Sequence, residues 1–175
     1  MVPMRASKYL SLPAMLLSAI VFSVVGVSAA ATINGTPAGE VLTGTQYEDT
    51  INSYGGNDTS TGQEGPDTVR GDTGWDTVGG NQGSDTVNGN VGNDQVGSGP
   101  GAGNVLSGGD DDDDLIGADT SSSNNTLDGE QGNDTLNARN NDTDVSIDGG
   151  AGTDVCLIDF GESSVVSHCE DVRPG

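Results

Sequence analysis

Aromatic and large apolar residues are scarce in this chain. Only six of the 175 residues are aromatic, and hydrophobic residues make up 31%, many of them in one run near the N-terminus. A chain that buries so little apolar surface usually fails to offset the conformational entropy lost on folding and stays disordered. The composition therefore excludes an ordinary globular core, and disorder is expected unless the sequence contains some internal order.

Basic residues are also scarce. Five Lys and Arg face 27 Asp and Glu, which gives a formal net charge of −22 at pH 7. Such a chain repels itself and does not attract nucleic acid or anionic membranes. Nucleic acid is therefore excluded as a partner, and something cationic is required to neutralise the acidic side chains.

Residues 1–31 have the organisation of a secretory signal peptide. A short basic stretch with Arg5 and Lys8 precedes an apolar run and then small residues, so that cleavage after Ala29 or Ala31 fits equally well. The alternative is an uncleaved membrane anchor, because the apolar run is nearly long enough to span a bilayer; the Ala-rich end without a basic stop favours cleavage. The sequence thus predicts a secreted, extracellular or cell-surface protein with no membrane insertion after cleavage. Because two basic residues leave with the leader, the net charge of the remaining chain becomes −24.

Beyond the leader, an acidic residue recurs every nine positions. The series is Glu40, Asp49, Asp58, Asp67, Asp76, Asp85 and Asp94. An apolar residue stands two positions after each member except at Ser60, and a Gly usually stands five positions before. An unbroken period over seven units is the signature of a solenoid, and it displaces the expectation of disorder.

The period continues with small slips to about thirteen units. Residues 71–78 read Gly-Asp-Thr-Gly-Trp-Asp-Thr-Val, and residues 80–87 read Gly-Asn-Gln-Gly-Ser-Asp-Thr-Val. Both resemble the nonapeptide Gly-Gly-x-Gly-x-Asp-x-apolar-x of the RTX, or haemolysin-type, family, with the second Gly replaced. The resemblance covers about residues 35–157. It implies an all-β fold, a right-handed parallel β-roll over residues 32–157, whose turns bind several calcium ions.

The residue types of the repeat suit this chemistry. Glycine lets the backbone turn tightly so that its carbonyls point at a common centre, and calcium takes six to eight oxygens from carbonyls and carboxylates. One apolar side chain in nine makes a thin core, so bound ions must supply much of the folding free energy. The predicted metal ligands are Asp49, Asp58, Asp67, Asp76, Asp85, Asp94, Asp113, Asp134, Asp154, Gly71, Gly74, Gly80, Gly83, Gly89 and Gly92.

If two nonapeptides make one coil, turns eighteen residues apart stack into two edges. The acidic edge carries Glu40, Asp58, Asp76, Asp94, Asp113, Asp134 and Asp154. The mixed edge carries Asp49, Asp67, Asp85, Asn104, Asn125 and Val145. We expect a row of calcium ions along the acidic edge, and calcium on the mixed edge only near its three Asp residues. Extra residues fall on the mixed edge at 97–103, 118–124 and 138–144, either as a partner-binding face or by neutral drift where calcium no longer constrains length.

Three further patterns in the sequence do not predict an additional metal site or a catalytic site. In the run Asp110–Asp114 only Asp113 is in phase with the repeat. Residues 144–149 resemble the start of an EF-hand loop but lack its glutamate and flanking helices. His168 is the single histidine, and no serine has a nucleophile motif around it, so the chain is not expected to be an enzyme.

Cys156 and Cys169 are the only cysteines, and an even pair in a secreted chain predicts a disulfide, with two free thiols as the alternative. Cys156 takes the inward apolar position of the last repeat. The bridge would fold the tail, residues 158–175, over the open end of the coil as a cap, with Val165 and Val166 covering its last apolar side chains.

Together these features predict a stand-alone, secreted protein that binds calcium and folds with it. A structural or buffering protein of the cell surface or matrix, and an adhesion module that binds a surface partner, both fit this scaffold. An ice-binding solenoid is disfavoured because the outward Thr rows break at Gln95 and Val105.

Overall fold

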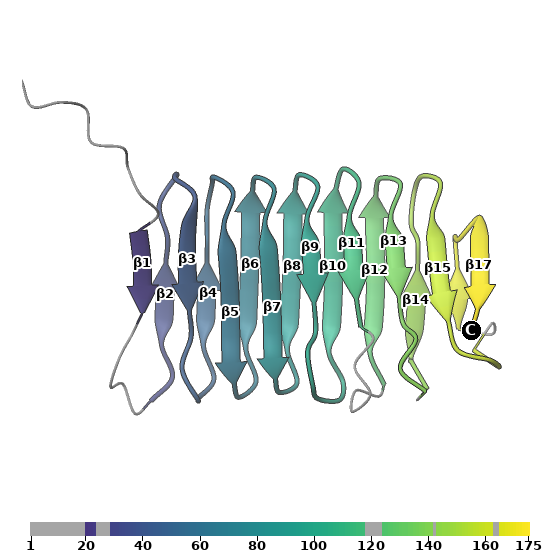
Figure 1. Cartoon of the computed structure of the whole chain (residues 1–175), viewed down its shortest axis with the longest axis horizontal. Coiled ribbons are helices and arrows are strands. Elements are labelled where there is room, and N and C mark those ends of the chain that lie inside the picture. Colours follow the sequence, from purple (N-terminus) through teal and green to yellow (C-terminus); the bar gives the residue numbers. More distant parts are fainter. Residues whose placement is uncertain (1–19, 24–28, 118–123, 142, 163–164) are drawn as a thin grey trace, which may run out of the picture.

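The computed structural model describes residues 20–23, 29–117, 124–141, 143–162 and 165–175, and shows a parallel β-solenoid of about seven turns. Successive strands alternate between two sheets that face each other, and each strand pairs with the strand two places along the chain (Figure 1). All pairings between strands are parallel in the described part of the chain. The predicted all-β roll is confirmed.

The strands are short, with two to six residues each. One sheet holds β1 (Ile20–Ser23), β3 (Glu40–Thr43), β5 (Thr59–Glu64), β7 (Thr77–Gln82), β9 (Gln95–Gly97), β11 (Asp114–Ile116), β13 (Thr135–Asn137), β15 (Val155–Ile158) and β17 (Asp171–Pro174). The other holds β2 (Thr32–Asn34), β4 (Thr50–Asn52), β6 (Thr68–Thr73), β8 (Thr86–Val91), β10 (Val105–Asp110), β12 (Thr126–Gln131), β14 (Ser146–Asp148) and β16 (Val166–Ser167).

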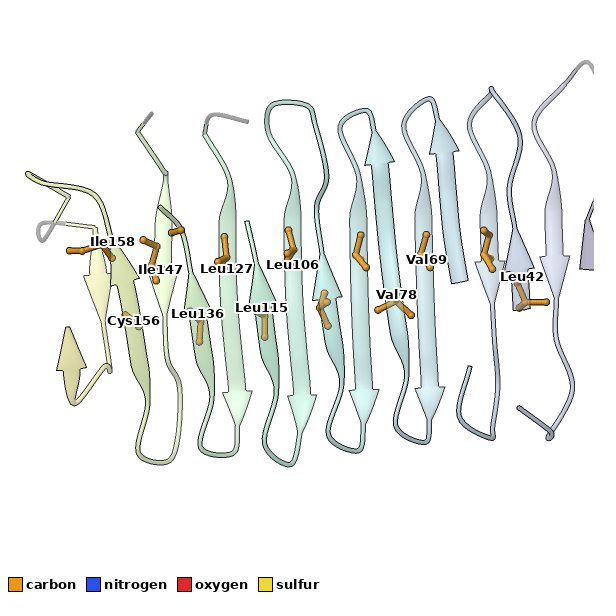
Figure 2. Packing of buried hydrophobic residues seen from close by; sticks show 14 of the residues in the cluster. Leu42, Val69, Val78, Leu106, Leu115, Leu127, Leu136, Ile147, Cys156 and Ile158 are labelled. Atoms are coloured by element: carbon orange, nitrogen blue, oxygen red, sulfur yellow. The ribbon is translucent and has the colours of Figure 1, made fainter. Parts of the chain in front are cut away.

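One inward side chain per repeat makes the core, as the period predicts. Strand side chains alternate between the two faces of a sheet, so the residue two places after each turn carboxylate points inward. Leu42, Ile51, Val69 and Val78 are at most 2% exposed, and the same row continues to Cys156 between the two sheets (Figure 2). Ser60, the exception in the apolar row, is also buried, and its Oγ lies 2.7 Å from Ser53 Oγ.

The register confirms that two nonapeptides form one coil. Thr59 lies opposite Thr77, and Thr68 opposite Thr86, so a strand is aligned with the residues eighteen places later. The acidic edge runs along the top of Figure 1 and the mixed edge along the bottom. Where the chain has extra residues the pairing persists, as between Leu106 and Leu127, because the insertions lie in the turns.

The C-terminal tail extends the roll. The disulfide between Cys156 and Cys169 is present, which confirms the predicted pairing. Instead of lying across the open end, the tail adds β16 to one sheet and β17 to the other. Val165 and Val166 pack against the core. The cap is therefore one further coil, and β17 becomes the last strand of its sheet.

At the other end, β1 lies inside the predicted leader and pairs with β3. The leader remains a prediction, and residues 1–19 and 24–28 of it lie outside the described residues. No helix in the described ranges is long and apolar enough to cross a membrane.

Candidate metal sites in the turns

The turns collect the predicted Asp ligands into two buried rows. All nine are 4% exposed or less, although each lies only one residue before an outward-facing strand position. Asp residues are almost never fully buried unless they are paired. The partners of their carboxylate oxygens therefore decide what these turns do.

One oxygen of each carboxylate joins neighbouring coils. Asp58 Oδ1 accepts a hydrogen bond of 2.6 Å from the Glu40 backbone N–H, and Asp76 Oδ1 accepts one of 2.7 Å from the Asp58 N–H. This ladder continues along the acidic edge until Glu170 accepts a hydrogen bond from the Asp154 N–H. It ties each turn to the turn one coil earlier.

The second oxygen of most carboxylates has no partner. Among the described residues, the buried Oδ2 atoms without a hydrogen bond belong to Asp58, Asp67, Asp76, Asp85, Asp94, Asp113, Asp134, Asp144 and Asp154. Buried polar groups are nearly always hydrogen-bonded, and a recurring exception points to a water or an ion. Asp49 is the predicted ligand that differs, because its Oδ2 accepts the Thr45 backbone N–H.

Burial raises the pKa of most of the carboxyl groups that have an unpartnered oxygen. The pKa of Asp58 rises to about 6, of Asp94 to about 7 and of Asp113 to about 8. Loss of hydration is the largest cause, the ladder N–H acts in the opposite direction, and neighbouring carboxylates raise the values further. Without a bound cation, it is therefore unfavourable to ionise all carboxyl groups of one row at neutral pH.

The predicted glycines leave room for these oxygens. A Cβ on Gly71 would lie 2.5 Å from Asp76 Oδ2, and a Cβ on Gly80 would lie 2.3 Å from Asp85 Oδ2. Gly89 is placed in the same way beside Asp94. These glycines therefore line the side of each turn on which the unpartnered oxygen lies.

The other predicted glycines let successive turns approach each other. A Cβ on Gly74 or on Gly92, both at positive φ, would lie 1.8 Å from a carbonyl oxygen of the preceding coil, and a Cβ on Gly83 would lie 2.0 Å from one. The second Gly of the family nonapeptide is replaced by residues such as Asn81 and Asn90, at φ 68° and 80°. Asn tolerates this left-handed conformation better than most residues, which explains the replacement.

These donors fit calcium, a hard cation that prefers carboxylate and backbone carbonyl oxygens. Across the described ranges, no three His, Cys, Asp or Glu side chains gather into a metal-holding group. The carboxylates are instead spaced one per turn, in turns whose backbone carbonyls pack closely from coil to coil. A bound ion would thus take its remaining oxygens from the backbone.

The mixed edge departs from the sequence interpretation at one position. Val145 was expected in the row, but it is 59% exposed, and Asp144 takes its place, accepting the Asn125 N–H at 3.2 Å through Oδ1. Two residues, instead of the usual one, separate Asp144 from the inward Ile147, so a strict period cannot find it. Glu162, which the sequence analysis also missed, then accepts the Asp144 N–H at 2.8 Å.

The Asp110–Asp114 run divides as the repeat phase predicts. Asp113 is buried with an unpartnered oxygen. Asp110 and Asp112 are exposed and accept hydrogen bonds from Gln131 and Asn133 of the next coil. Of the longer turns on the mixed edge, residues 118–123 and 142 lie outside the described residues.

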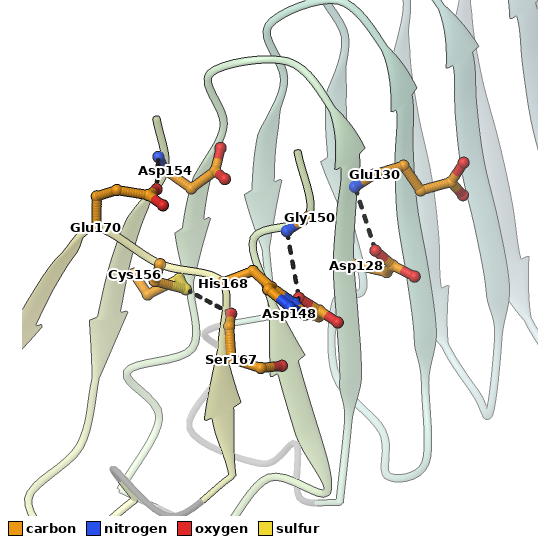
Figure 3. Close-up of polar contacts among 10 residues, drawn as sticks. Asp128, Glu130, Asp148, Gly150, Asp154, Cys156, Ser167, His168 and Glu170 are labelled. Carbon is orange, nitrogen blue, oxygen red and sulfur yellow. Dashed lines mark hydrogen bonds and ion pairs between the residues drawn. A yellow bond between two sulfur atoms is a disulfide. The ribbon is translucent and has the colours of Figure 1, made fainter. Parts of the chain in front are cut away.

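His168 is exposed, as expected of a lone histidine, but its contact was not foreseen. Its Nδ1 lies 2.7 Å from Asp148 Oδ1, beside the disulfide (Figure 3). The His168–Asp148 contact raises the pKa of the His168 imidazole through the hydrogen bond and the negative charge. This pair belongs to the attachment of the tail and not to the rows of turns.

Comparison with protein families gives one match. A model of the RTX calcium-binding nonapeptide repeat matches in four copies, over residues 34–69, 70–104 and 118–143, which together make up more than half of the chain. No curated protein and no solved structure shows a significant match.

Proposed function

The chain belongs to the RTX calcium-binding nonapeptide repeat family, and we propose that it is a secreted protein whose roll folds when calcium enters its turns. The observation that carries this proposal is the set of nine buried Asp oxygens without a partner, six in successive turns of the acidic edge and three on the mixed edge. A bound cation would give each oxygen a partner and offset its charge, and the family's repeats bind calcium.

Calcium and folding are coupled because neither the core nor the acidic rows stabilise the roll alone. The core has one buried apolar side chain per repeat. The carboxylates that stack above one another repel, and the raised pKa values express the cost of ionising them in the folded chain. A site that forms only in the folded chain adds its binding free energy to folding.

A calcium titration of the chain without its leader tests this coupling. Far-UV circular dichroism should change from coil to β as calcium rises, with a midpoint of about 0.1–1 mM, as in other extracellular calcium modules. Magnesium, which demands a smaller octahedral site, should not replace it at the same concentration. A β spectrum that persists in excess chelator would show that folding does not need the metal.

Secretion rests on the leader alone. N-terminal sequencing of the protein recovered from the culture medium should begin at Ala30 or Thr32. Recovery of the intact N-terminus from the membrane fraction would instead favour the anchor.

A further inference from the structure

We propose that two side-chain amides replace calcium in the middle of the mixed edge, at the turns of Asn104 and Asn125. The inference rests on the proposed calcium binding and goes beyond it, because it assigns which turns hold no metal. The mixed edge then consists of metal-binding turns before Asn104, a metal-free segment, and a resumed site at Asp144.

The ladder fixes how the two amides are oriented. Asn104 Oδ1 accepts the Asp85 backbone N–H at 2.8 Å, and Asn125 Oδ1 accepts the Asn104 N–H at 3.1 Å. In the Asp turns this position belongs to Oδ1 as well, as where Asp67 accepts the Asp49 N–H. Because the amide oxygen must face the N–H of the preceding coil, the NH2 group takes the place of the unpartnered carboxylate oxygen.

That NH2 group is satisfied by the turn itself. Asn104 Nδ2 donates to the Gly101 carbonyl at 3.2 Å and to Asn125 Oδ1 at 3.1 Å. Asn125 Nδ2 donates to the Gly117 carbonyl at 3.3 Å. Both Asn side chains are fully buried, yet neither has an unpartnered atom, whereas Asp85 before them and Asp144 after them each have one.

A side-chain NH2 group can take over the role of the calcium ion in these turns. In a metal-binding turn, the cation attracts the carboxylate and the backbone carbonyls together. In the Asn turns, an N–H donor binds the carbonyl without any charge, and its hydrogens would repel a cation in the same place. No carboxylates repel one another at these two turns, so in the folded roll their hydrogen bonds form without a bound cation.

Counting bound calcium per chain tests this assignment. Equilibrium dialysis with elemental analysis should show one more calcium in Asn104→Asp, and one more in Asn125→Asp, than in the unmodified chain. Asn88→Asp is the matched control, because it adds the same carboxylate on the outward side of β8 and should add no ion. Both turn variants should also need a higher calcium concentration to fold, since each brings a new buried charge.

The reverse change guards against variants that fail to fold. Asp85→Asn should bind one calcium fewer and reach the same β circular dichroism at saturating calcium. An unchanged count in both turn variants, or in Asp85→Asn, would overturn the assignment while calcium binding itself stands. If the unmodified chain bound no calcium, the proposed function itself would fail, which is a different result.

Discussion

Opening the disulfide should loosen one end of the roll and leave the rest intact. Cys156 and Cys169 are 13 residues apart, and closing a loop of this length removes unfolded-chain entropy equivalent to about 3 kcal/mol. The loop encloses β16 and leads directly into β17. The stabilisation therefore falls on the last coil.

Other contacts hold the same coil. The Asp171 N–H donates to the Asp154 carbonyl at 3.0 Å, and the Arg139 guanidinium donates to the Arg173 carbonyl at 2.6 Å. The Arg139 contact is exposed and competes with water, so these contacts offset only part of the loss. Without the disulfide, hydrogen exchange of the β17 amides should speed up by as much as about a hundredfold, since each tenfold change corresponds to about 1.4 kcal/mol.

Hydrogen exchange in saturating calcium, on the oxidised protein and on Cys169→Ser, measures this effect. The variant keeps the buried Cys156 in place, so the core is undisturbed. The amides of β6 and β8, paired with each other in the middle of the roll, serve as the internal control. Uniform loss of protection along the chain, or unchanged protection in β17, would refute the account of the cap as a disulfide-held coil.

Further outcomes follow from the turns and the core. Asp76→Ala should weaken calcium binding more than Asn125→Ala, as measured by calorimetric titration, and equal losses would contradict the division into two edges. Because burial raises the pKa of Asp94 to about 7 and of Asp113 to about 8 from a usual 3.8, the folded metal-free chain binds more protons than the unfolded chain between about pH 4 and pH 8. Its stability is therefore fully present below about pH 4 and is lost as the pH rises, so β circular dichroism in chelator should increase on acidification; a decrease would contradict this. Leu115→Ala, at a fully buried position, should cost about 2–5 kcal/mol in urea unfolding of the calcium form, whereas a cost below about 1 kcal/mol would mean that the core contributes little.

Much of the roll follows from the sequence because each repeat contacts only its neighbours. A nine-residue period places Asp76 in a turn and Val78 in the core without any knowledge of distant contacts. The same reasoning identifies Cys156 as an inward residue, and the presence of only one other cysteine in a chain expected to be secreted pairs it with Cys169. Both were confirmed.

The period fails where the chain departs from it locally. Asp144 was missed because an extra residue separates it from Ile147, and counting in nines selects Val145 instead. The amide hydrogen bonds of Asn104 and Asn125 could not be predicted from the sequence either, because they depend on which carbonyl oxygen lies within hydrogen-bonding distance. The last coil was predicted as a plug over the end because residues 158–175 do not keep the repeat, although their backbone still pairs with both sheets.

The eighteen-residue register makes the length of the roll adjustable in whole coils. Excision of residues 59–76 would join Asp58 to Thr77, which already lies opposite Thr59 in the sheet. The Glu40 N–H would keep Asp58 as its acceptor, and the Asp58 N–H would meet Asp94 in place of Asp76. Duplication would insert a coil by the same route. Unequal recombination between repeats would therefore yield folded proteins that differ in length and calcium capacity, with both ends of the roll unchanged.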